Sequence, residues 1–292
     1  METLKEVKAQ PLPPASLATL ERLRNENCSE SSKDFHLQSF QIFLRRKLSP
    51  ESPNRNMLLF HGTGVGKTCT AIQVAEEYIL RPEYQDKKVI VLAGKAVQSS
   101  FRTQIFDVAR LDEQNGVILS QQCTGRRYLD MLQRAQKERI RVNDADTRES
   151  LNKTIQGIVD DFYEFTPYQS FANQVESLMI KEGKKGIEKE FNNRLIIVDE
   201  AHALRTGDES QKLVSAQIET IVKTAKGVTL VLLTATPMFD TFEEVLYYFN
   251  LFLWNDGKQT ADQRILAEDI FKKSGEFVSP AADAQFLSLI HI

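Results

Sequence analysis

Residues 57–68 read MLLFHGTGVGKT, an apolar run followed by a glycine-rich loop that ends in Lys-Thr. The apolar run is typical of a buried strand, and the residues that follow, CTAIQVAEEYIL, are typical of a helix. A strand, a glycine-rich loop and a helix N-terminus in this order bring backbone N–H groups together around an anion. The stretch therefore predicts a phosphate-binding loop at the end of a strand in an α/β sheet.

The side chains of this loop predict that the phosphate belongs to a nucleotide. We expect Lys67 to reach the outer phosphates and the Thr68 hydroxyl to hold Mg²⁺. His61 stands where the strict template G-x-x-x-x-G-K-[ST] has its first glycine, but the second half of the loop makes the main phosphate contacts. A glycine turn with a chance Lys-Thr is the alternative, and the flanking strand and helix argue against it. The predicted nucleotide-binding residues of the loop are Gly62, Thr63, Gly64, Val65, Gly66, Lys67 and Thr68.

A second apolar run ends in two adjacent carboxylates. Residues 194–203 read RLIIVDEAHA, and the continuous apolar stretch predicts a strand buried on both faces of a parallel sheet. Ligands of such sheets lie at the carboxyl ends of the strands. We expect Asp199 to hold Mg²⁺ there through its water shell, and Glu200 to orient or deprotonate the attacking water. The alternative, an exposed acidic turn, is disfavoured by the loop upstream, so the predicted catalytic residues are Glu200, Lys67 and Asp199.

A third apolar run ends in threonines. Residues 228–237 read VTLVLLTATP, another predicted buried strand. Asp-Glu-Ala-His followed by Thr-Ala-Thr-Pro resembles motifs II and III of superfamily 2 helicases and translocases. This resemblance implies that Thr234 and Thr236 link the ATP site to a nucleic-acid site, and that His202 connects motif II with motif III. Taken by itself, the run is better explained by an ordinary proline turn after a strand, but its place as the third motif in this order argues against that reading.

The segment before the loop extends the resemblance. Residues 36–49, HLQSFQIFLRRKLS, are similar to the segment that precedes the P-loop in helicase-like ATPases of large DNA viruses. That group includes the small subunit of the poxvirus early transcription factor and nucleoside triphosphate phosphohydrolase I, and the similarity runs from about residue 35 to residue 253. It implies that ATP and Mg²⁺ are the cofactors and that Gln41 reads the adenine edge, although Ser39-Phe40 replaces the usual Pro-His.

These motifs predict a RecA-like α/β domain, a doubly wound and mostly parallel sheet of the P-loop NTPase type, as the first of the two domains of a superfamily 2 motor. We expect a flexible N-terminal arm at 1–34, the ATP-binding domain at 35–255 with a helical insertion at about 126–160, and a linker or the start of a second domain at 256–292. Strands are expected at 57–60, 88–93, 116–119, 161–165, 195–198 and 229–233, and helices at 68–80, 97–110, 128–139, 168–181, 211–224, 241–253 and 265–277.

The composition is typical of a globular intracellular protein. Of the 292 residues, 41% are hydrophobic and 26% charged, no apolar run reaches about 18 residues, and the first residues lack a signal-peptide core. The three cysteines, Cys28, Cys69 and Cys123, are an odd number at wide spacing, so the sequence predicts neither a disulfide framework nor a zinc site. Free thiols favour a reducing compartment, which for a viral protein means the virion or the cytoplasmic replication site of the host.

The formal net charge of −3 does not exclude nucleic acid, because translocases hold their track in a local cleft. The residues after the second predicted strand stand where the resembling family has motif Ia, and a later loop follows the fourth predicted strand. A solvated helix end is an equally good explanation of each position. The candidate nucleic-acid contacts are Lys95, Gln98, Ser99, Arg102 and Thr166.

The C-terminal part of the sequence is short for a motor. After residue 237 there are 55 residues, and they contain no third Gly-rich loop and no Gln-x-x-Gly-Arg-x-x-Arg element, the usual motif VI. The second domain of a superfamily 2 motor supplies an arginine finger, a contribution of roughly 10³–10⁵ in rate. We therefore expect the N-terminal ATPase half of a longer motor, with a missing C-terminal RecA-like domain as its partner. This half is expected to bind ATP with little turnover.

Three functions fit these motifs. The first is an ATP-dependent nucleic-acid translocase or helicase of viral transcription initiation or termination, acting on duplex DNA by preference and beside a viral RNA polymerase. The second is a translocase subunit of restriction or Swi/Snf type. The third is a nucleotide-gated switch ATPase that does not act on nucleic acid. Motif III and the motif Ia region argue against the third, and stimulation of hydrolysis by nucleic acid separates it from the others.

Overall fold

A computed structural model describes residues 37–279, except 63, 65, 85, 115–116, 121, 136–144, 205–208, 238–243, 273 and 275. The arm predicted at 1–34 and the residues after 279 lie outside the described part. So do Thr63 and Val65 of the predicted nucleotide-binding residues.

The centre of the fold is an all-parallel sheet, as predicted. Within the described residues it has five strands in the order β1-β7-β6-β2-β5. The three middle strands are buried along their whole length, which explains their continuous apolar sequences. Leu92 pairs with both Thr166 and Val198, so β5, β2 and β6 end level with one another. The strands are β1 (Asn56–Phe60), β2 (Val89–Leu92), β5 (Tyr163–Thr166), β6 (Leu195–Val198) and β7 (Thr229–Thr234).

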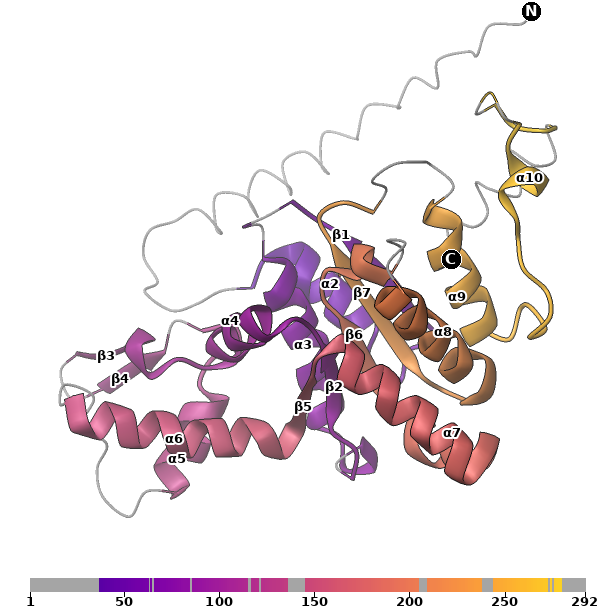
Figure 1. Ribbon diagram of the computed structural model, residues 1–292. Helices are drawn as coiled ribbons and strands as arrows, with labels where there is room; N and C mark the ends of the chain where they lie inside the picture. The colour runs from indigo at the N-terminus through magenta and orange to yellow at the C-terminus, as the bar shows by residue number, and fades with distance from the viewer. Residues whose placement is uncertain are drawn as a thin grey trace, which may run out of the picture.

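Helices cover both faces of the sheet, and each face has its own hydrophobic core (Figure 1). In β2, Val89 and Val91 point to one face while Ile90 and Leu92 point to the other, as the period of a strand requires. The first face packs against α3 (Lys67–Ile79), α4 (Lys95–Ile105), α5 (Arg127–Ala135) and α6 (Ala145–Phe162). The second packs against α7 (Tyr168–Phe191), α8 (Glu209–Thr224) and α9 (Glu244–Asn255). The doubly wound prediction is confirmed.

The remaining elements are short or peripheral. Helix α2 (Ser39–Lys47) lies beside α3, and α5 and α6 occupy the region near 126–160 where a helical insertion is expected; that they are an insertion stays a prediction. Single turns of 3₁₀ helix occur at η1 (Pro82–Tyr84), η2 (Val108–Arg110) and η3 (Ala201–Leu204). None of the helices in the described part of the chain is long and apolar enough to cross a membrane.

Four expectations about elements are wrong. The strand predicted at 116–119 is β4 (Val117–Ser120), which pairs antiparallel with β3 (Leu111–Gln114) in a separate two-stranded sheet. The helix predicted at 97–110 ends at Ile105, and α7 extends ten residues past its predicted end across a break at Gly183. The helix predicted at 265–277 is only α10 (Ala267–Ile270), because the side-chain amide of Asn250 in α9 donates to the Ile265 carbonyl and accepts the Ile265 N–H, which holds the start of the predicted helix in an extended form.

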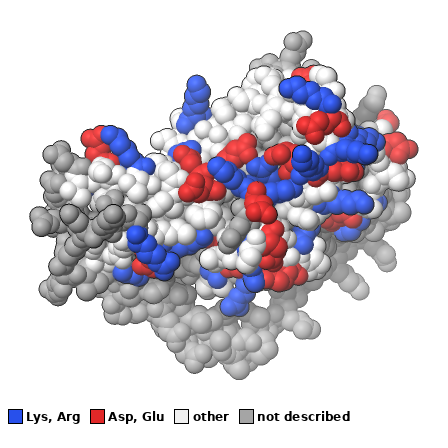
Figure 2. All heavy atoms as spheres, turned by 90° about the horizontal axis from the view of Figure 1, so that it is seen from below, with Lys and Arg blue, Asp and Glu red and all other residues white. Residues whose placement is uncertain are grey.

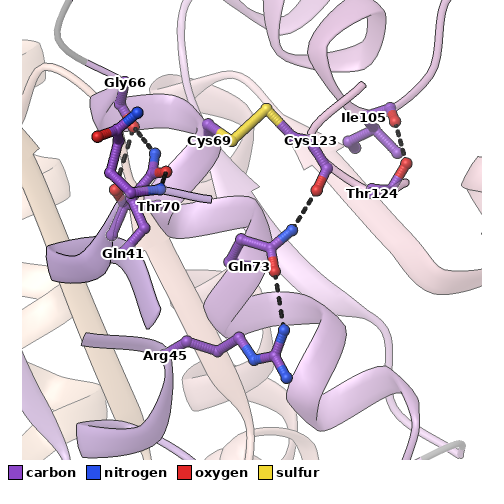
Figure 3. The surroundings of a disulfide bond; sticks show 10 residues. Gln41, Arg45, Gly66, Cys69, Thr70, Gln73, Ile105, Cys123 and Thr124 are labelled. Atoms are coloured by element: carbon purple, nitrogen blue, oxygen red, sulfur yellow. Dashed lines mark hydrogen bonds between the residues drawn. A yellow bond between two sulfur atoms is a disulfide. The ribbon is translucent and has the colours of Figure 1, made fainter. Parts of the chain in front are cut away.

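The expectation of free thiols is also wrong for two of the three cysteines. Cys69 in α3 and Cys123 form a disulfide with Cα atoms 5.6 Å apart (Figure 3). The turn that carries Cys123 folds against α3, where the Gln73 side chain donates a hydrogen bond to the Cys123 carbonyl and Thr124 donates to the Ile105 carbonyl over 2.7 Å. A spacing of 54 residues gives no sign of this contact. With two of the three cysteines paired, the cysteines give no support for a reducing compartment.

Candidate nucleotide-binding and hydrolysis site

The glycine-rich loop leaves β1 and leads directly into α3. Gly64 and Gly66 have φ of 81° and 87°, the left-handed region that glycine adopts without steric cost. Lys67 is the first residue of α3 and Thr68 the second, so both follow the helix N-terminus on which anions bind. The loop therefore has the backbone geometry that its sequence predicts.

A cleft of about 490 Å³ opens at this loop. The loop, the two residues that follow β6 and one face of α4 line it. That face was not predicted, because the sequence analysis assigned other α4 residues to nucleic acid. The described lining residues are Gly62, Gly64, Gly66, Lys67, Thr68, Ala96, Val97, Ser100, Gln104, Asp199 and Glu200.

The charged groups of the two motifs meet in the cleft. Lys67 Nζ lies 3.6 Å from Glu200 Oε1, and the Lys67 side chain is only 10% exposed. Asp199 is buried, and its Oδ1 accepts the Glu200 N–H over 2.9 Å. Burial raises the pKa of Asp199 above that of an ordinary aspartate, while the Glu200 N–H and the Lys67 ammonium oppose this shift.

The oxygen donors present fit Mg²⁺. The Thr68 hydroxyl and the Asp199 carboxylate both line the cleft, and neither sulfur nor imidazole does so among the described lining residues. No group of three or more His, Cys, Asp or Glu in the described part of the chain could hold a metal ion. Mg²⁺ keeps several waters and takes one or two protein ligands together with substrate phosphates, so the Thr68 hydroxyl and the Asp199 carboxylate would be enough to hold it.

Motif III contacts motif II directly. His202 Nδ1 lies 3.2 Å from Thr234 Oγ1 and 3.2 Å from Glu200 Oε2. Thr234 Oγ1 also accepts the N–H of Thr236 over 3.1 Å. The structure therefore brings together all three residues that the resemblance assigned to coupling, and it connects them to the carboxylate at the cleft.

Gln41 contacts the loop from α2. Its side chain is 4% exposed, its Nε2 donates to the Gly66 carbonyl over 3.4 Å, and its Oε1 accepts the Gln38 N–H over 2.9 Å (Figure 3). A Cβ atom at position 66 would lie 2.9 Å from Gln41 Nε2, so a side chain there would displace the end of the Gln41 side chain. The structure brings Gln41 to the nucleotide loop, and its adenine contact stays a prediction.

Of the candidate nucleic-acid contacts, four lie on α4 and the fifth ends β5. Lys95 and Ser99 are exposed on α4, whereas the Gln98 amide donates to the Ala93 carbonyl over 2.7 Å. Arg102 pairs with Asp160 at 2.6 Å and its guanidinium lies 4.1 Å from the centre of the Phe165 ring.

Thr166, the last of these candidates, is buried. On the face that Figure 2 shows, Lys and Arg side chains alternate with Asp and Glu. Nucleic-acid contact at these positions stays a prediction.

Tyr168, the first residue of α7, is a site residue that the sequence analysis missed. Its hydroxyl donates a hydrogen bond to the main-chain carbonyl of Asp199. Burial, with the carboxylates of Asp199 and Glu200, raises the pKa of the Tyr168 hydroxyl. In the sequence, Tyr168 stands three residues after a predicted strand and at the first position of a predicted helix.

Comparison with known families agrees with this geometry. The family model described as type III restriction enzyme, res subunit, matches residues 30–239. The chain belongs to this family. The fold, the motifs and the viral relatives together identify its domain as the N-terminal RecA-like domain of a superfamily 2 helicase related to those of large DNA viruses.

Viral relatives of this family member are similar over most of its length. It is 31% identical over 240 residues to the candidate helicase 087L of Invertebrate iridescent virus 3, covering 79% of this chain and 21% of that protein. It is 26% identical over 230 residues to the candidate ATP-dependent RNA helicase R563 of Acanthamoeba polyphaga mimivirus, covering 78% of this chain and 34% of that protein. The chain thus spans about a fifth to a third of the length of these relatives.

Among solved structures, the Hef helicase domain of Pyrococcus furiosus aligns with a TM-score of 0.42 and 18% identity. The alignment covers 74% of this chain and 36% of that one. The fold assignment therefore rests on the sheet order and the two helical layers described above.

Proposed function

We propose that this chain is the ATPase module of a nucleic-acid-dependent superfamily 2 motor, and that it binds and hydrolyses Mg-ATP in the cleft between the glycine-rich loop and the end of β6. The observation that carries the proposal is the continuous set of contacts from Lys67 to Glu200, His202 and Thr234. These contacts link a phosphate-binding residue to a candidate base, and the base through His202 to a coupling residue. A simple phosphate-binding loop needs only the first of these.

Each residue has a distinct task in this proposal. The Lys67 ammonium holds the outer phosphates. An incoming phosphate competes for this ammonium with the Glu200 carboxylate, which lies 3.6 Å away. The Thr68 hydroxyl and Asp199 carboxylate hold Mg²⁺, which when bound neutralises charge on the phosphates. Glu200 orients the attacking water and accepts its proton. Gln41 and the loop residues Gly62, Thr63, Gly64, Val65, Gly66 and Lys67 bind the nucleotide.

The track that we propose is duplex DNA, in a viral transcription motor that works beside an RNA polymerase. The resemblance to ATPases of large DNA viruses supports this subtype, and the relatives reported above are themselves viral. A DNA translocase of restriction type is the second candidate, which the matching family model favours. The name of the mimivirus relative includes RNA helicase, so RNA belongs among the tracks to be tested.

The first test is Mg-ATP binding and hydrolysis by this chain beside Lys67→Ala, with duplex DNA, single-stranded DNA and RNA each added in turn. We expect tight Mg-ATP binding that Lys67→Ala weakens at least about tenfold, because a charge-assisted hydrogen bond is lost. Lys153→Ala is the matched control, since the Lys153 side chain is exposed on α6 and does not line the cleft. Binding that survives Lys67→Ala unchanged would contradict the site.

Turnover by this chain alone is expected to be slow. The described residues that line the cleft include no arginine to stabilise charge on the transferred phosphoryl group. The nucleic acid that raises turnover, or whose affinity changes when Mg-ATP is added, identifies the track. If none of the three nucleic acids raises turnover, and none changes its affinity when Mg-ATP is added, the chain is a nucleotide-gated switch and the motor proposal is wrong.

A further inference from the structure

The peptide unit between Asp199 and Glu200 is held at both ends. Its carbonyl oxygen accepts the Tyr168 hydroxyl, and its N–H donates to Asp199 Oδ1 over 2.9 Å. Glu200 has a φ of 52°, in the left-handed region that residues with a side chain seldom adopt. Such a conformation persists only where the surroundings restrain it.

The topology explains how Tyr168 reaches this peptide. Thr166 ends β5, Pro167 precedes the helix, and Tyr168 is the first residue of α7. Because β2 lies between β5 and β6 and the three strands end level, the Tyr168 side chain crosses the end of β2 to meet Asp199. Its ring packs against the hydrophobic core of the second face, which fixes the hydroxyl in place.

The side chain of Glu200 has separate restraints. Lys67 Nζ lies 3.6 Å from one of its carboxylate oxygens and His202 Nδ1 lies 3.2 Å from the other. These contacts fix the carboxylate relative to the cleft, and the first of them weakens when a phosphate takes the Lys67 ammonium. The Tyr168 hydrogen bond is made to the main chain and does not depend on what occupies the cleft.

We infer that Tyr168 is a positioning residue for Glu200: it holds the Asp199–Glu200 peptide in the orientation that directs the Glu200 carboxylate into the cleft. This role rests on the proposed hydrolysis of ATP. The same hydrogen bond connects the start of α7 to the site: a displacement of the Thr166–Tyr168 segment moves the Tyr168 hydroxyl and therefore the peptide that it holds. Binding of a track near that segment would thereby alter the rate of hydrolysis without touching the nucleotide.

The test is Tyr168→Phe, which keeps the ring and removes one hydroxyl. We expect the single-turnover rate of ATP hydrolysis to fall about threefold to tenfold, the range that the loss of one buried hydrogen bond gives. The Kd for Mg-ATP should stay within about twofold of wild type, because Lys67 and Thr68 are untouched. Hydrogen exchange across residues 195–204 should become faster, because the Glu200 amide loses the restraint on its peptide.

Tyr78→Phe is the matched control. The Tyr78 hydroxyl is also buried and lies 2.7 Å from Thr229 Oγ1, at the opposite end of the sheet. Equal losses of rate in both variants, or a wild-type rate and wild-type exchange in Tyr168→Phe, would overturn the inference. Failure of the wild type to bind Mg-ATP would instead contradict the proposed function, and hydrogen exchange in the nucleotide-free protein would still test the restraint on the peptide.

Discussion

Lys67 Nζ lies 3.6 Å from Glu200 Oε1, so the first residue of α3 and the second residue after β6 form an ion pair across the cleft. The Lys67 side chain is nearly buried, and a buried ammonium needs a partner. Glu200, which is 41% exposed at its side chain, supplies one while remaining open to the cleft. The pair keeps the two proposed reactive groups in place before a phosphate enters between them.

Glu200→Gln should separate binding from hydrolysis. The amide cannot accept a proton from water, so we expect single-turnover hydrolysis to fall by about 10²–10⁴. Mg-ATP affinity should be kept or slightly raised, because a carboxylate that competes with phosphate for Lys67 is removed. Calorimetry and single-turnover kinetics measure the two quantities. Glu176→Gln on the exposed face of α7 is the control, and wild-type turnover in Glu200→Gln would exclude Glu200 as the base.

Asp199 should make nucleotide binding sensitive to acid. Burial raises its pKa above 3.8, so the carboxylate that holds Mg²⁺ becomes protonated at a higher pH than an ordinary aspartate. The gain in nucleotide affinity that Mg²⁺ gives should therefore fall as the pH is lowered from about 8 to about 5. Titration of a fluorescent ATP analogue with and without Mg²⁺ measures this gain, and Asp199→Asn should show little gain at any pH.

Low pH should affect the stability of the fold through Asp199 in the opposite direction to its effect on nucleotide binding. Because the pKa in the folded state is raised, the folded protein binds the Asp199 proton more tightly than the unfolded chain does. This carboxyl therefore favours folding at low pH, and its contribution is lost as the pH rises from 3.8 through the folded pKa. Asp199→Asn should gain stability relative to wild type at neutral pH, measured by urea denaturation. A loss there would show that Lys67 outweighs burial.

Thr234→Val should uncouple the site from its track. The substitution keeps the shape of the side chain but removes the hydroxyl that lies 3.2 Å from His202 Nδ1 and accepts the Thr236 N–H. We expect basal turnover and Mg-ATP affinity near wild type, and a loss of most of the stimulation by nucleic acid. Thr220→Val on α8 is the control, since its hydroxyl bonds only within its own helix. Full stimulation in Thr234→Val would remove Thr234 from the coupling role.

The sequence predicted the elements that carry a local signal. The bounds of β1 (Asn56–Phe60) and α3 (Lys67–Ile79) lie within one residue of the predicted bounds. The bounds of β6 match the prediction at both ends. Each combines a buried apolar run with turn or glycine chemistry that acts within about ten residues. The site residues that follow these strands therefore meet in the cleft as expected, because the ends of parallel strands lie at one edge of the sheet.

What the sequence analysis missed depends on contacts between distant residues or on a signal that was overlooked. The order β6-β2-β5, which sets Tyr168 beside Asp199, is not encoded in any single segment. The contact of Cys123 with Cys69 depends on how the turn after β4 folds onto α3. The hairpin of β3 and β4 was predictable, because Asn-Gly at 115–116 is the dipeptide most typical of a tight hairpin.

The disulfide should stabilise the fold by an amount set mainly by the loop that it closes. For the sequence separation of 54 between Cys69 and Cys123, the loss of entropy in the unfolded chain corresponds to about 4 kcal/mol. Cys123→Ser, or a reductant added to wild type, should therefore lower the free energy of unfolding by up to about 4 kcal/mol in urea denaturation.

Cys28→Ser is the control for this disulfide prediction, because it removes a thiol and leaves the pair intact. Cys69 directly follows Thr68, so the disulfide holds the start of α3. We therefore expect Mg-ATP affinity to fall when the link between α3 and the Cys123 turn is lost, and the same samples serve to measure it. A thiol titration that finds three free cysteines in the folded protein, or a reductant that leaves wild-type stability unchanged, would contradict the bond.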